Sequence, residues 1–76
     1  MKTLDLEQVV VRVARDLQLV DAQGALIELD SMKVTDLLIE LEKQSGLNIP
    51  IEVISASAFV SLEAVTGMLR QAAALS

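Results

Sequence analysis

The sequence predicts an all-α fold, a small bundle of three main helices and one short helix. Apolar residues recur at helical spacing in three segments, and a residue that commonly caps helices precedes each segment. With 76 residues and no repeat or linker, we expect a single domain over residues 1–76. Because 53% of the residues are hydrophobic and Phe59 alone is aromatic, the core should be aliphatic.

The first helix is expected from about Asp5 to Leu17, with Asp5 as its capping residue. Its apolar face consists of Leu6, Val9, Val10, Val13 and Leu17. The run of three valines from residue 9 lowers helix propensity slightly. It also permits a strand, but the alternation that a strand needs fails on both sides of the run.

Residues 19–29 are expected to form an ordered connector. Turn-forming residues lie near its middle, at Asp21, Gln23 and Gly24. In an extended chain, the segment "ALIEL" would place Ala25, Ile27 and Leu29 on one side. Because the sequence offers no obvious partner strand, we interpret this segment as a loop held on the core by its apolar side chains.

The second helix is expected from Ser31 to about Ser45, between an N-cap at Asp30 and a C-cap at Gly46. Its buried face consists of Val34, Leu37, Leu38 and Leu41. A different face carries two large apolar side chains beside carboxylates. This second face consists of Met32, Asp36, Ile39 and Glu40.

The segment "GLNIP" ends that helix and turns the chain, since Pro50 disfavours helix at Ile49. A short helical turn is expected over residues 55–59, although "IEVI" just before it could form a strand if it had a partner. The last helix should run from Leu62 to about Ala74, capped by Ser61. Its inner face consists of Leu62, Val65, Met68, Leu69 and Ala72.

The composition excludes several kinds of function. The chain has no His and no Cys, so it lacks the usual acid–base residue, the thiolate nucleophile and the best zinc ligands. We therefore expect no catalytic residues and no metal site. The formal charge of −5 argues against nucleic-acid binding. No apolar run reaches the ~20 residues of a membrane span, and the acidic start "MKTLDLEQVV" is unlike a signal peptide. We expect a cytoplasmic monomer.

The segment "LDSMKVTDLLIELEKQSGLNIP" resembles the central part of acyl carrier proteins. Those proteins begin their second helix with Asp-Ser-Leu, continue with a leucine-rich helix, and reach Ile-Pro after a short turn. Here Asp30-Ser31-Met32 corresponds to the first motif, and Ile49-Pro50 follows 18 and 19 positions after Ser31. The match is close over residues 27–50 and loose elsewhere, although the length and helix order also agree.

The resemblance implies that Ser31 carries a 4′-phosphopantetheine arm taken from coenzyme A. The thiol of the arm would hold an acyl or aminoacyl group as a thioester, which would explain why the chain needs no Cys or His. Asp30 would support the modification, because in the family this residue helps to hold the metal ion used by the modifying enzyme. The implied partners are a phosphopantetheinyl transferase and the loading and condensing enzymes of fatty acid or polyketide biosynthesis.

The docking surface for these partners is expected on the exposed face of the second helix. Apolar contacts would give affinity and the carboxylates would steer the approach. The candidate residues are Met32, Lys33, Asp36, Ile39 and Glu40. An equally open interpretation of Met32 and Ile39 is that they are ordinary half-buried side chains.

Two departures from the family pattern are informative. Glu28 stands where the family usually has Gly, and Lys33 stands where carriers of fatty acid synthesis tend to have an acid. Lys33 favours a specialised carrier over a general fatty-acid one.

Two other classes of function stay open. One is an unmodified helical module that docks on a larger enzyme. The other is an enzyme in its own right, for which the sequence offers no nucleophile paired with a base.

Overall fold

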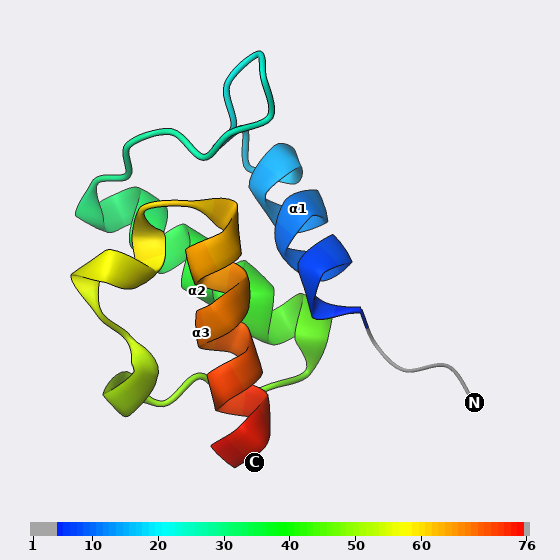
Figure 1. Cartoon of the computed structure of the whole chain (residues 1–76), viewed down its shortest axis with the longest axis vertical. Helices are drawn as coiled ribbons and strands as arrows, with labels where there is room; N and C mark the ends of the chain where they lie inside the picture. The colour runs from blue at the N-terminus through cyan, green and yellow to red at the C-terminus, as the bar shows by residue number, and fades with distance from the viewer. Residues whose placement is uncertain (1–4, 76) are drawn as a thin grey trace.

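The computed structural model describes residues 5–75, which fold into three α-helices and two short 3-10 helices, with no strand among them. The elements in chain order are α1 (Leu6–Asp16), α2 (Ser31–Ser45), η1 (Ile51–Val53), η2 (Ala56–Phe59) and α3 (Leu62–Leu75) (Figure 1). The predicted all-α class is therefore confirmed. The expected short helix over residues 55–59 corresponds to η2, whereas η1 is an additional short helix that the sequence pattern did not predict.

Side-chain caps fix where the three long helices begin. Asp5 Oδ1 accepts a hydrogen bond from the Glu7 N–H at 3.1 Å at the start of α1. Ser61 Oγ accepts one from the Ala64 N–H at 3.0 Å at the start of α3. These bonds satisfy amides that have no partner inside the first turn of a helix. Each helix consequently begins within one residue of the predicted position.

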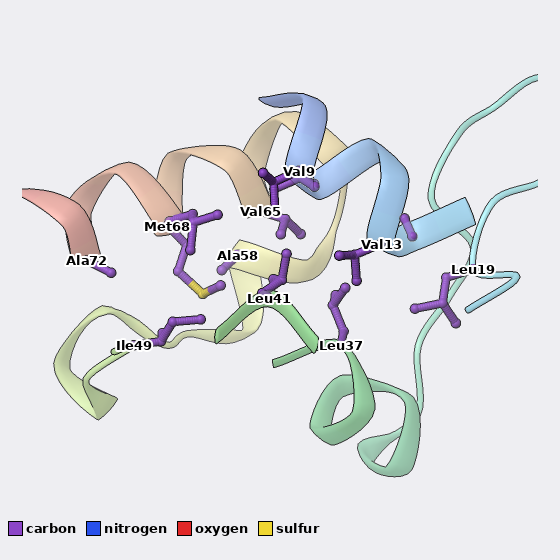
Figure 2. Close-up of a cluster of buried hydrophobic side chains, with 13 residues drawn as sticks. Val9, Val13, Leu19, Leu37, Leu41, Ile49, Ala58, Val65, Met68 and Ala72 are labelled. Atoms are coloured by element: carbon purple, nitrogen blue, oxygen red, sulfur yellow. The ribbon is translucent and has the colours of Figure 1, made fainter. Parts of the chain in front are cut away.

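The core lies where α1 packs against both α2 and α3 (Figure 2). Leu37 and Leu41 of α2, and Val65 and Leu69 of α3, have no exposed surface. The remaining buried apolar residues are Val9, Val10, Val13, Ala14, Leu19, Ile49, Ala58, Met68 and Ala72. The predicted faces are thus largely correct, although some of their residues are only half-buried, namely Leu6, Leu17, Val34, Leu38 and Leu62.

The connector crosses one end of the bundle, and its tip projects away from the helices (Figure 1). The Asp21 carboxylate accepts hydrogen bonds from the N–H groups of Gln23 and Ala25, at 2.9 and 3.0 Å, which closes a tight turn. That turn lets Val20 and Leu26 form a single antiparallel bridge. One bridge does not make a strand, so the interpretation of "ALIEL" as a loop is confirmed, although one of its residues does pair with another segment.

The side chains of the connector differ in one respect from the prediction. Leu26, Ile27 and Leu29 pack against the core, as expected of a segment held on it. Ala25 is exposed, because the bridge at Leu26 turns the preceding residue outward. The connector is therefore an ordered segment that leads to the start of α2. Contacts with the core hold it on both sides of its turn.

The segment after α2 is anchored by two contacts. Gly46 has a φ of 72°, a left-handed conformation that suits glycine and ends the helix. The Glu42 carboxylate then accepts a hydrogen bond from the Ile49 N–H at 2.9 Å, and the Ile49 side chain is buried in the core. Pro50 precedes η1 with extended backbone, and Ile49 lies outside any helix, as predicted from the effect of a proline on the residue before it.

Candidate modification and docking site

Ser31 is the first residue of α2 and is exposed to solvent. Its hydroxyl makes no hydrogen bond within residues 5–75. Every other Ser or Thr hydroxyl in this range has a partner, since these groups cap helices, bond to the preceding turn or pair with each other. The hydroxyls with partners belong to Thr35, Ser45, Ser55, Ser57, Ser61 and Thr66. The Ser31 hydroxyl is thus accessible and not engaged in holding the fold.

Asp30 performs the capping that Ser31 does not. Its Oδ1 accepts a hydrogen bond from the Lys33 N–H at 2.9 Å, and its backbone is extended, as an N-cap requires. Its Oδ2 lies 3.9 Å from Lys33 Nζ, a distance at which the two charges interact weakly because both side chains are well exposed. Of the two residues that could cap α2, only Asp30 has this structural role.

The start of α2 can accommodate an anion. The N–H groups of Ser31 and Met32 have no protein acceptor within the described part of the chain. They lie at the positive end of the helix dipole, where negative charge is stabilised by about 0.3–1 kcal/mol at an exposed site. The first turn contains no acid and carries Lys33, so the carboxylates nearest to a phosphodiester on Ser31 would be those of Asp30 and Asp36, one on each side of that turn.

A surface pocket of about 230 Å³ adjoins Ser31, and exposed side chains line it. Its lining residues are Ser31, Met32, Thr35 and Asp36. Thr35 was not predicted to belong to the site. Its hydroxyl donates a hydrogen bond to the Ser31 carbonyl at 2.9 Å, a contact that the spacing of four residues could have indicated.

The predicted docking residues do share the exposed side of α2 around this pocket. Met32 is 77% exposed and Ile39 is 51% exposed, so these two large apolar side chains face solvent and do not belong to the core. Asp36 lies one turn from each of them. Glu40 is less exposed and lies 3.4 Å from Lys43 Nζ, a pairing that the sequence analysis did not anticipate although its spacing of three residues permits it.

Comparison with protein-family models, with curated proteins and with solved structures finds no match for this chain. The structure defines a small all-α bundle with an accessible serine at a helix start. The resemblance to acyl carrier proteins stays a prediction from the sequence.

No helix within residues 5–75 is long and apolar enough to cross a membrane. The same part of the chain contains no group of three carboxylates that could hold a metal ion.

Two substitutions of Asp30 separate its cap from its charge. Asp30→Ala should lower the free energy of unfolding by about 1 kcal/mol, whereas Asp30→Asn should leave it nearly unchanged, because asparagine caps as well as aspartate. Urea unfolding followed by circular dichroism measures both. If the carboxylate also supports modification of Ser31 by helping to hold the metal ion of the modifying enzyme, both variants should be modified at least about tenfold more slowly, since loss of a residue that supports a metal site costs about 10–100-fold in metal affinity or activity. Equal rates for Asp30→Asn and the wild type would show that only the cap matters.

Proposed function

We propose that this chain is a carrier protein in which Ser31 bears a covalent 4′-phosphopantetheine group. The observation that carries the proposal is the Ser31 hydroxyl, which is exposed and is the one Ser or Thr hydroxyl within residues 5–75 that has no partner. A serine that served only the fold would be expected to cap α2, and Asp30 does so instead.

The residues around Ser31 fit the group. The hydroxyl oxygen supplies the ester bond, and the unsatisfied N–H groups of Ser31 and Met32 lie where phosphate oxygens would be stabilised. The thiol of the arm supplies the thioester chemistry when it is attached. The chain itself presents the attachment point on a rigid helix and offers the exposed side of α2 to the enzymes that load and use the cargo.

The partners of this function are a phosphopantetheinyl transferase and acyl- or aminoacyl-loading and condensing enzymes. The resemblance over residues 27–50 supports this class of partner, within fatty acid, polyketide or a related specialised biosynthesis. Lys33 supports the specialised case, because it places a positive charge beside the attachment point. The competing proposal is an unmodified helical module that docks on a larger enzyme.

Intact-mass spectrometry tests the proposal. The chain is incubated with coenzyme A, Mg²⁺ and a broad-specificity phosphopantetheinyl transferase, and a carrier protein known to be a substrate is treated in parallel. We expect a mass increase of one phosphopantetheinyl group. An unchanged mass, under conditions that modify the parallel carrier completely, would favour the unmodified module.

A further inference from the structure

A surface groove of about 380 Å³ runs along α1 on the side opposite its buried residues. Its lining residues are Glu7, Gln8, Val11, Arg12, Arg15 and Asp16. They form two adjacent rows along the helix with a spacing of four residues, and such rows are the ridges between which a second helix packs. Because a single helix lines it, the groove cannot enclose a small ligand, and the occupant that fits its shape is another helix.

Two cations without a partner lie between the two acids of this groove. Arg12 and Arg15 are exposed, and neither forms an ion pair or a hydrogen bond within residues 5–75. Arg12 does not pair even with Asp16, which follows it at a spacing of four residues that permits an ion pair. A guanidinium offers a planar fork of donors that matches a carboxylate. The groove therefore fits a helix with two acids near the middle of its exposed side.

The ends of the groove carry the opposite charge. Glu7 and Asp16 are exposed, and neither has an ion pair in the described part of the chain. They would repel a polyanion, as would the formal charge of −5. In order along α1, the groove reads acid, cation, cation, acid over about 14 Å. Its complement is a helix that reads cation, acid, acid, cation over a similar length.

Four charged residues on the exposed side of α2 have this complementary order, with about 15 Å from the first to the last. They are Lys33, Asp36, Glu40 and Lys43. The ion pairs of the two lysines within the chain join exposed or partly exposed groups, so they are weak and leave the lysines able to meet other acids. Met32 and Ile39 lie among the four charges, and both are mostly exposed. A helix packed here would therefore cover apolar surface as well as pair charges, as the contacts of an interface do.

We propose that two copies of this chain associate by packing the α1 groove of one copy on the exposed side of α2 of the other, with Arg12 and Arg15 opposite Asp36 and Glu40. The acids at the ends of the groove then face the two lysines of α2. This association goes beyond the proposed function and does not depend on modification of Ser31. One helix from each copy buries less than the about 1,200 Å² of a stable interface, so we expect a Kd on the order of 1 mM. At micromolar concentrations the chain is then the monomer expected from its sequence.

The experiment follows the backbone amides of the full chain by ¹H–¹⁵N NMR at low salt, over a dilution series from about 2 mM, twice the expected Kd, to about 20 µM. The variants Arg12→Glu and Asp36→Arg each reverse one charge of the proposed contact. Arg70→Glu and Glu63→Arg are the matched controls, because they make the same charge changes at exposed residues of α3. Circular dichroism of each variant confirms that it is folded.

We expect amides of the α1 groove and of the exposed side of α2 to shift with concentration in the wild type and in both controls. Arg12→Glu and Asp36→Arg should each weaken self-association at least about fivefold, since an attractive pair of exposed charges becomes a repulsive one. An equal mixture of these two variants should associate within about twofold of the wild type. In the mixture each variant supplies the charge that the other has lost, so the opposed pairs form again.

Amide shifts of the wild type that stay constant up to about 2 mM would overturn the proposal. A mixture that associates no better than either variant alone would show that α1 of one copy does not meet α2 of another. Equal weakening by the α3 controls would mean that only net charge matters, and the proposed contact would again be wrong. The carrier function stands or falls separately, by the mass of the treated chain.

Discussion

Replacing Ser31 with alanine is expected to abolish the attachment of phosphopantetheine while leaving the fold intact. The hydroxyl oxygen is the only atom lost, and it makes no hydrogen bond in the described part of the chain. Alanine is the best helix former, and Asp30 still caps α2, so the free energy of unfolding should change by less than about 0.5 kcal/mol. The intact mass after treatment with the transferase should remain that of the unmodified chain.

Ser57→Ala is the control for this substitution. Ser57 is also exposed, and its hydroxyl pairs with that of Ser55 at 3.1 Å in η2. We expect this variant to gain one phosphopantetheinyl group at the wild-type rate. Modification of Ser31→Ala to the same extent as the wild type would place the attachment at another residue and remove the basis of the proposed function.

Replacing Leu41 with alanine is expected to destabilise the fold more than any surface change. The side chain is fully buried in the core between the helices (Figure 2). Leu-to-Ala changes at such positions cost about 2–5 kcal/mol, because apolar burial is lost and a cavity remains. A chain of this length has a total stability of about 4–11 kcal/mol. Urea unfolding should therefore show a much lower midpoint for this variant.

Leu75→Ala is the matched control, because Leu75 is 65% exposed near the end of α3. Its midpoint should stay close to that of the wild type, since surface substitutions usually change stability by less than about 0.5 kcal/mol. Similar losses in the two leucine variants would contradict the core described above. They would mean that Leu41 does not lie in the core where α2 packs against α1.

The helices were predictable from sequence because local signals and burial agree. Asp5, Asp30 and Ser61 are capping residues that directly precede the helices with apolar faces. Gly46 ends α2, because glycine readily adopts the φ of 72° found there. The smaller features lack such agreement. The helix η1 spans only three residues, too few for a helical repeat of apolar residues to be visible in the sequence. The bridge between Val20 and Leu26 depends on the turn of the connector, which brings two short extended segments together.

The candidate site was predictable in its position but not in its detail. The spacing on α2 correctly placed Met32 and Ile39 on an exposed face. The sequence correctly placed the N-cap of α2 at Asp30, but it could not show that the Ser31 hydroxyl has no hydrogen-bond partner. Nor does a count of charges show that lysines pair with some acids and leave Asp36 without a partner, since pairing depends on side-chain conformation.

The most direct test of the central claim is the mass of one tryptic peptide after incubation with coenzyme A, Mg²⁺ and the transferase. Cleavage after Arg15 and Lys33 releases residues 16–33, in which Ser31 is the only hydroxyl-bearing residue. The carrier function predicts that this peptide gains one phosphopantetheinyl group and that no other peptide does. An unmodified 16–33 peptide from a chain exposed to an active transferase would contradict it.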